Sequence, residues 1–195
     1  MAKLYFRYGA MGCGKTMQLL QVAFNYEERG MKVCVIKPQT DTKNGNKLLT
    51  RIGPERHTDL CFDQNVNLYE VISQAYKNVS CVLVDESQFL TPAQADQLMQ
   101  IVINCDIPVI AYGLRLNFRC EDKGFEGATR LLQIADEIEE LKTICECGRK
   151  ATLNCRFIDD KLITTGPDIL IDDGTTKIEY RALCPKCYEK HKNQK

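Results

Sequence analysis

The sequence has no excess of charge of either sign. Its 195 residues include 26 Lys and Arg and 26 Asp and Glu, so the formal net charge is zero. Nonspecific affinity for nucleic acid comes mostly from basic side chains that neutralise phosphates. The balance therefore argues against a general nucleic-acid-binding protein, although it leaves room for a small phosphate site.

Long apolar segments are missing as well. No apolar run approaches the roughly 18 residues of a membrane-spanning helix, and the first residues show no charged stretch followed by an apolar one. We therefore expect a soluble cytoplasmic protein with no membrane partner. The 11 cysteines are then expected to be free thiols or metal ligands, because disulfides are rare in a reducing compartment.

The motif that organises the chain lies near its start. The residues Gly9-Ala10-Met11-Gly12-Cys13-Gly14-Lys15-Thr16 match the pattern G-x-x-x-x-G-K-[ST]. Residues 3–8 alternate as a strand does, and residues 17–29 have the pattern of an amphipathic helix. A loop in this position presents backbone N–H groups and a helix N-terminus to a polyphosphate. Lys15 would reach the β- and γ-phosphates, and the Thr16 hydroxyl would help to hold Mg²⁺.

Strands and helices alternate over the following residues. Apolar runs predict strands at 32–37, 81–84 and 108–112, and helices are predicted after Asn67, after Thr91 and around 128–135. The segment 39–63 has no regular period and is expected to be a long loop. We predict an α/β fold of the P-loop NTPase, RecA-like type, with a mostly parallel sheet and a small C-terminal zinc-binding β domain.

Two adjacent acids, Asp85 and Glu86, follow the strand predicted at 81–84. The carboxyl ends of parallel strands meet at one edge of the sheet, so both acids are expected beside the phosphate loop. Neighbouring strand positions point in opposite directions, which would let Asp85 hold Mg²⁺ while Glu86 accepts a proton from a nucleophile. Two solvated acids at a strand end are the alternative.

The character of the sequence changes near Leu141. We predict a P-loop nucleotide-binding domain at 1–141 and a small β-rich domain at 142–195. The second domain contains two cysteine pairs, Cys145 with Cys147 and Cys184 with Cys187. Four thiolates on two short loops are typical of a structural, tetrahedral zinc site. A redox dithiol is the competing interpretation of the C-x-x-C pair, and Cys155 is a less favoured zinc ligand.

Together these motifs resemble the thymidine kinase family of bacteria and the animal cytosol. The resemblance extends from Leu4 to about Tyr188, and it includes the segments Asp85-Glu86-Ser87-Gln88-Phe89, Tyr112-Gly113-Leu114-Arg115 and Phe125-Glu126-Gly127. It implies transfer of the γ-phosphoryl group of ATP to the 5′-hydroxyl of thymidine, and of deoxyuridine, with Mg²⁺ and a structural Zn²⁺. It also implies a homotetramer that thymidine triphosphate inhibits.

The resemblance further implies roles for single residues. Glu86 would be the general base for the 5′-hydroxyl, and Asp85 and Gln88 would join the phosphate loop in binding ATP. The segment before Tyr180 would close over the base as a lasso. The residues implied to bind the nucleoside are Met11, Asp41, Phe89, Leu114, Phe118, Phe125, Arg156 and Tyr180.

Two functions of other classes compete with a nucleoside kinase. A P-loop motor could use the same acids to activate water, but the zero net charge and the small size argue against a macromolecular track. A zinc-ribbon interaction module on a degenerate nucleotide fold is opposed by the complete phosphate loop. Only the kinase would consume ATP in a way that depends on an added deoxynucleoside.

Overall fold

The computed structural model describes residues 1–39, 47–50, 53–120, 124–167 and 177–193. Within these ranges, no helix combines the length and the apolar composition that crossing a membrane requires.

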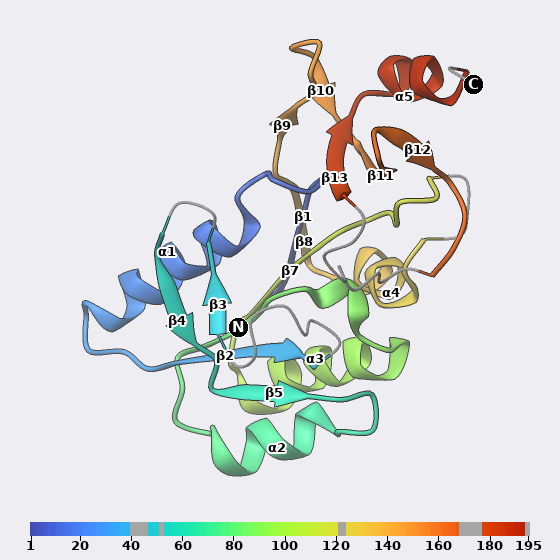
Figure 1. Cartoon of the computed structure of the whole chain (residues 1–195). Helices are drawn as coiled ribbons and strands as arrows, with labels where there is room; N and C mark the ends of the chain where they lie inside the picture. Colours follow the sequence, from blue (N-terminus) through green and yellow to red (C-terminus); the bar gives the residue numbers. More distant parts are fainter. Residues whose placement is uncertain (40–46, 51–52, 121–123, 168–176, 194–195) are drawn as a thin grey trace.

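A six-stranded sheet forms the centre of the larger part of the molecule (Figure 1). Its strands lie in the order β5-β2-β6-β7-β1-β8, and each neighbouring pair is parallel. Their bounds are β1 Leu4–Tyr8, β2 Val33–Pro38, β5 Leu60–Phe62, β6 Cys81–Val84, β7 Val109–Gly113 and β8 Glu137–Glu140. The predicted parallel α/β sheet is therefore confirmed.

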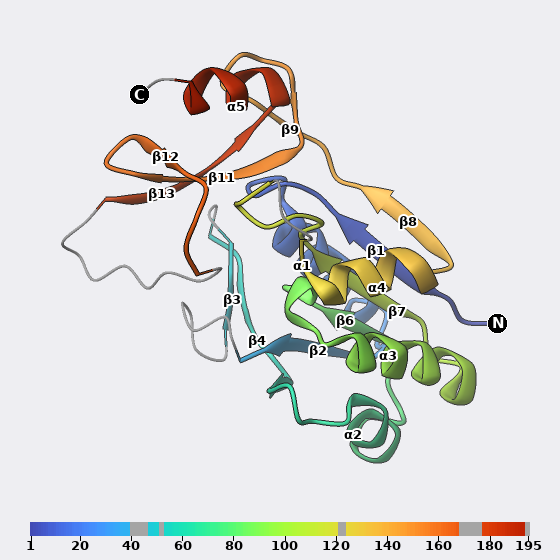
Figure 2. The ribbon, with the colours of Figure 1, turned by 90° about the vertical axis from the view of Figure 1, so that its right-hand side faces the viewer.

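Helices cover both faces of this sheet (Figures 1 and 2). Helix α1, Lys15–Glu27, packs against one face, where Val35 and Leu83 are buried beside its Leu19. The other face, with Ile36 and Val84, packs against α2 Leu68–Ala75, α3 Pro92–Cys105 and α4 Glu126–Ile134. Burial on both faces explains why β2 and β6 are nearly continuous apolar runs.

Local capping signals fixed two of the helix starts. Thr91 Oγ1 accepts a hydrogen bond from the Gln94 N–H, and the Gln94 side chain accepts one from the Thr91 N–H. This is the predicted capping box, with Pro92 at the first helical position. Asn67 caps α2 through a hydrogen bond from the Glu70 N–H. Both predicted caps are confirmed.

Two regions differ from the expectation. The segment 39–63 is not a plain loop, because it contains β3 Lys47–Leu49 and β4 Glu55–His57, which form an antiparallel hairpin, and then β5. Strands of three residues are too short to show a period in the sequence. Strand β8 was not predicted either. Its sequence, Glu-Ile-Glu-Glu, is that of an exposed strand at the sheet edge and lacks the apolar run by which β2, β6 and β7 were recognised.

A smaller β unit lies above the central sheet in Figure 1 and covers the loops that leave β1 and β7. In it β11 Leu153–Ile158 pairs with β12 Lys161–Ile163 and β13 Ile178–Leu183, beside a short ladder of β9 Thr143–Ile144 with β10 Lys150–Ala151. Helix α5, Pro185–Lys192, follows β13. The predicted boundary between 141 and 142 falls between β8 and β9, and the division into two domains stays a prediction.

Close packing at the start of α4 supports the segment that follows β6. A β-carbon on Gly127 would lie 2.2 Å from the Leu90 carbonyl oxygen. Because that atom belongs to the backbone, we expect Gly127→Ala to lower the free energy of unfolding by about 1–3 kcal/mol through overpacking. Urea unfolding measures this, with Gln133→Ala on the exposed side of α4 as the control. Equal midpoints for the two variants would contradict the prediction.

Candidate functional site

The phosphate loop connects β1 to α1, as predicted. Gly14 caps α1 with a φ of 84°, in the left-handed region that favours glycine. Gly9 is confined for a different reason, since a β-carbon there would lie 2.4 Å from the Leu141 carbonyl oxygen. Glycine is thus needed at both ends of the loop, and α1 directs its N-terminal N–H groups to the same place.

Lys15 and Thr16 tie this loop together and join it to the end of β6. The Lys15 ammonium donates to the carbonyl oxygens of Ala10 at 3.2 Å and Gly9 at 3.4 Å, and the residue is only 8% exposed. Thr16 Oγ1 donates to Asp85 Oδ2 at 3.1 Å. The phosphate loop and the first of the two acids therefore meet at the carboxyl edge of the sheet, as the sequence predicted.

Asp85 lies in a setting that disfavours its negative charge. The residue is buried, and its Oδ1 atom has no hydrogen-bond partner among the described residues. Burial, assisted by the nearby Glu86 charge, raises the pKa of Asp85 from 3.8 to about 7. A buried carboxylate oxygen without a partner, beside a threonine hydroxyl, suits a divalent cation with hard oxygen ligands.

The backbone of Glu86 differs from the extended backbone that the sequence predicts. We expected strand alternation to separate the two acids, but β6 ends at Val84. Glu86 instead has a left-handed backbone, with a φ of 49°, and opens the short 3₁₀ turn η2 Ser87–Phe89. A non-glycine residue in this region is uncommon and strained, and such residues gather at functional sites.

The Gln88 side chain holds the Glu86 carboxylate in place. Its Nε2 donates to Glu86 Oε2 at 2.5 Å, and its Oε1 accepts from the Leu114 N–H at 3.0 Å. Gln88 is only 2% exposed. The amide therefore links the turn after β6 to the chain after β7, and the predicted contact of Gln88 with ATP stays a prediction.

Five of the eight residues predicted to bind the nucleoside form two groups. Arg156 Cζ lies 3.6 Å from the centre of the Phe118 ring, and its Nε donates to the Tyr180 hydroxyl at 2.9 Å. Phe89 and Phe125 form a separate edge-to-face pair with ring centres 5.5 Å apart. In the first group, Arg156 and Tyr180 belong to β11 and β13 of the small β unit. The second group lies in η2 and at the start of α4.

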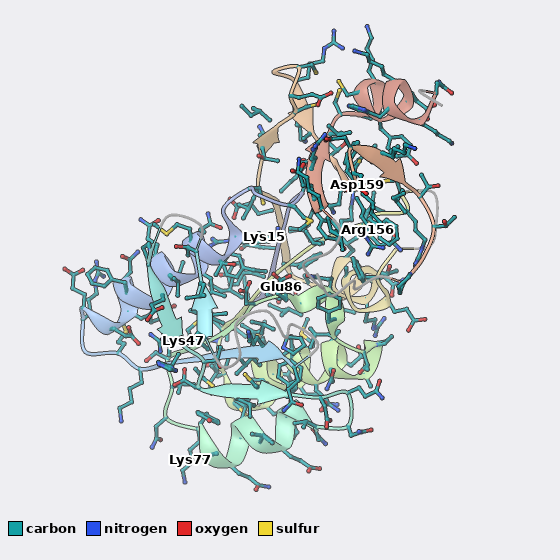
Figure 3. The ribbon with its side chains drawn as sticks, viewed as in Figure 1. Lys15, Lys47, Lys77, Glu86, Arg156 and Asp159 are labelled. Carbon is teal, nitrogen blue, oxygen red and sulfur yellow. The ribbon has the colours of Figure 1, made fainter. Side chains whose placement is uncertain are left out.

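Three further predicted residues have other positions. Leu114 donates its N–H to Gln88, and Met11 donates its N–H to Asn154 Oδ1 at 2.7 Å. Asp41 lies outside the described residues. Figure 3 shows Lys15 and Glu86 on the side of the sheet that faces the small unit, where Arg156 lies, whereas Lys77 lies at the far end of the molecule.

Asn154 is the site residue that sequence reasoning missed. It is buried in β11, and its side chain contacts both Met11 and Leu116. A single Asn between apolar residues carries no recognisable motif. The only hint was its position two residues before Arg156, which places both side chains on one face of a strand.

The two cysteine pairs come together as predicted. The sulfur atoms of Cys145, Cys147, Cys184 and Cys187 all lie within 4.8 Å of one another, and those of Cys147 and Cys184 are 3.6 Å apart. Tetrahedral zinc with Zn–S bonds of about 2.3 Å places its sulfurs at about the separation found for Cys147 and Cys184. The Cys187 backbone amide lowers the pKa of the Cys184 thiol to about 7, which favours the thiolate that binds metal.

Cys155, considered as a substitute ligand, is not a member of this cluster. It is buried in the core of the small unit, and a hydrogen bond with Cys120, together with burial, raises the pKa of its thiol. The compact set of four sulfurs favours a metal site over a redox dithiol, because a dithiol needs only two of them.

Comparisons with known proteins agree with this geometry. A family described as thymidine kinase matches residues 2–188. A thymidine kinase of Francisella tularensis subsp. holarctica is 44% identical over 192 residues, which cover 95% of this chain and 96% of the relative. A thymidine kinase of Coxiella burnetii is 47% identical over 95% of this chain and 94% of its own length. One of Enterobacteria phage T4 is 42% identical over 95% of each chain.

Proposed function

The chain belongs to the thymidine kinase family, and from this premise we propose how its own residues phosphorylate thymidine with ATP. One observation carries the proposal. The phosphate loop is joined at the carboxyl edge of the sheet to Asp85, which precedes the Glu86–Gln88 pair, and it also contacts β11, the strand that carries Arg156, through Met11 and Asn154. A phosphoryl donor on the loop and a nucleoside under β11 would then meet at Glu86.

We propose that ATP binds with its phosphates on the loop 9–16. The N–H groups at the start of α1 and the Lys15 ammonium supply positive potential to the β- and γ-phosphates. Thr16 and Asp85 would hold Mg²⁺, which neutralises charge on the transferred group when it is bound. The buried Asp85 oxygen without a partner among the described residues supports this assignment.

Glu86 is proposed as the general base. Its carboxylate accepts the proton of the 5′-hydroxyl as the hydroxyl oxygen attacks the γ-phosphorus and the bond to the ADP oxygen breaks. The hydrogen bond from Gln88 occupies Oε2 and so fixes which oxygen faces the substrate. Positioning of this kind contributes to the rate because the reacting atoms are already aligned.

The nucleoside is proposed to bind beside the Arg156, Phe118 and Tyr180 group. Arg156 is fully buried between two aromatic rings, so its planar group is held in one orientation. A fixed guanidinium and a flat ring suit a pyrimidine, in thymidine or in deoxyuridine. Met11, Leu114, Phe89 and Phe125 stay predicted contacts, as do Asp41 and the lasso.

We also propose three traits on family membership alone. They are a homotetrameric assembly, inhibition by thymidine triphosphate and a cytoplasmic location. Zinc is proposed for the four-cysteine cluster on its sulfur geometry. The zinc would be structural, because four protein ligands leave no open position for a substrate.

The test of the function is an assay with ATP and Mg²⁺ that offers thymidine, deoxyuridine, deoxycytidine or no nucleoside in parallel. We expect thymidine monophosphate to form and little product from deoxycytidine. Formation of the 5′-monophosphate should be matched by release of one ADP. Hydrolysis of ATP at the same rate in all four reactions would instead indicate a motor.

The Asp85 assignment predicts an effect on stability that depends on pH. Without a cation, the unfolded chain ionises this carboxyl near 3.8 and the folded chain near 7, so the free energy of unfolding falls as the pH rises between these values. Asp85→Asn removes the ionisable group and therefore this decrease in the free energy of unfolding. Its side-chain oxygen can still accept the Thr16 hydrogen bond. We expect a higher melting temperature than the unaltered chain at pH 8 in magnesium-free buffer without chelator, with weaker stabilisation by Mg²⁺ and ATP. A lower melting temperature in that buffer would contradict it.

A further inference from the structure

The Asn154 side chain joins segments that lie far apart in the sequence. It is the second residue of β11 and is only 3% exposed. Its Oδ1 accepts from the Met11 N–H in the phosphate loop at 2.7 Å, and its Nδ2 donates to the Leu116 carbonyl, after β7, at 2.8 Å. Both partners are backbone groups, so Asn154 is the residue that contributes a side chain to this link.

An uncharged amide is the group that suits both bonds. A backbone N–H can only donate and a carbonyl can only accept, which fixes the orientation of the Asn154 amide. Aspartate could accept from Met11, but its second oxygen would face the Leu116 oxygen without a hydrogen. Leucine has a similar size and makes neither bond. Because the site is buried, a partner that is left unpaired costs more than the bond itself contributes.

The same face of β11 also contacts the nucleoside side of the site. Residues two apart on a strand share a face, so Asn154 and Arg156 project together toward the larger unit. Arg156 reaches the Phe118 ring and the Tyr180 hydroxyl, and Figure 3 places it at this junction. One rigid strand therefore touches the phosphate loop through one side chain and the proposed nucleoside site through the next.

We propose that Asn154 is a positioning residue that couples the binding of ATP to the binding of thymidine, an inference that rests on the proposed function. While Met11 donates to Asn154, the phosphate loop keeps the shape and position that this bond requires. A ligand that orders the loop thus orders β11, and the second ligand meets a smaller ordering cost. The coupling is reciprocal, so each ligand raises the affinity for the other by the same factor.

Calorimetric titration of the full chain measures this factor. The Kd of thymidine is determined with and without saturating Mg²⁺ and a non-hydrolysable ATP analogue, and the Kd of the analogue with and without thymidine. In the unaltered chain we expect the two Kd ratios to be equal, with a value of about 5 to 150. We expect ratios near 1 in Asn154→Leu and clearly reduced ratios in Asn154→Asp. Asn104→Leu, on the exposed surface of α3, is the matched control and should keep the full ratio.

Each outcome decides the inference. An unchanged ratio in both Asn154 variants, with the two affinities weakened equally, would overturn it and leave Asn154 a packing residue. A ratio of 1 in the unaltered chain would overturn it as well, while binding of neither ligand there would overturn the proposed function together with it. If Asn154→Leu does not fold, the Asn154→Asp ratio decides alone, because that variant keeps the size of the side chain but loses the Leu116 bond, which helps to hold the Asn154 amide against the Met11 N–H.

Discussion

Glu86→Gln is expected to lower kcat by about 10²–10⁴-fold while the affinity for ATP stays nearly the same. The substitution removes the proposed acceptor of the 5′-hydroxyl proton, and a positioned base typically contributes a factor of this size. The side-chain oxygen of glutamine can still accept the hydrogen bond from Gln88 Nε2. The geometry of the turn should therefore survive, so the loss reports on proton transfer rather than on misfolding.

Steady-state kinetics and ATP titration measure the two quantities separately. Glu28→Gln, at the exposed end of α1, removes the same charge far from the reacting groups and should leave kcat unchanged. A loss confined to the KM for ATP would assign Glu86 to nucleotide binding. Unchanged turnover would remove it from the mechanism.

Loss of the metal is expected to have the second large effect. Removing zinc with a strong chelator, or removing one ligand with Cys187→Ser, should unfold the small β unit and abolish thymidine phosphorylation. Small domains of this kind draw much of their folding free energy from metal binding. The described core of this unit is itself built partly from the ligands Cys145 and Cys184. Because β11 carries Arg156, disorder of this unit would also disrupt the proposed nucleoside site.

Metal content by mass spectrometry and limited proteolysis measure this prediction. The unaltered chain should hold one zinc ion and resist cleavage within β11, β13 and α5, whereas Cys187→Ser should lose both properties. Cys105→Ser, at the end of α3, removes a thiol outside the cluster and serves as the control. Full activity and protease resistance in the chelated protein would show that the cluster does not stabilise this unit.

Local features were predictable from the sequence. The phosphate loop, the capping box of α3 and each cysteine pair are defined by residues a few positions apart, so their spacing specifies their geometry. The position of Asp85 followed from one general rule on parallel sheets. These features needed no knowledge of which strands are neighbours.

Features that depend on distant partners were not predictable. Strand β8 is recognisable only because β1 pairs with it across more than a hundred residues of chain. The Gln88 amide contacts Leu114, and the Asn154 amide contacts Leu116 and Met11. The fold brings these residues together from distant parts of the sequence, and the left-handed backbone of Glu86 likewise depends on the fold. The sequence does not show which residue a polar side chain in an apolar run will contact.

The arrangement of the central sheet has a consequence for biosynthesis. All six strands of that sheet precede Leu141, whereas the four sulfurs of the metal cluster are divided between the start of the small unit and the far end of β13. N-terminal parts of a chain can fold while later parts are still being translated. The phosphate-binding half can therefore form on the ribosome before Cys184 and Cys187 complete the small unit that carries Arg156. A nascent chain would then be able to bind ATP before the proposed nucleoside site is complete.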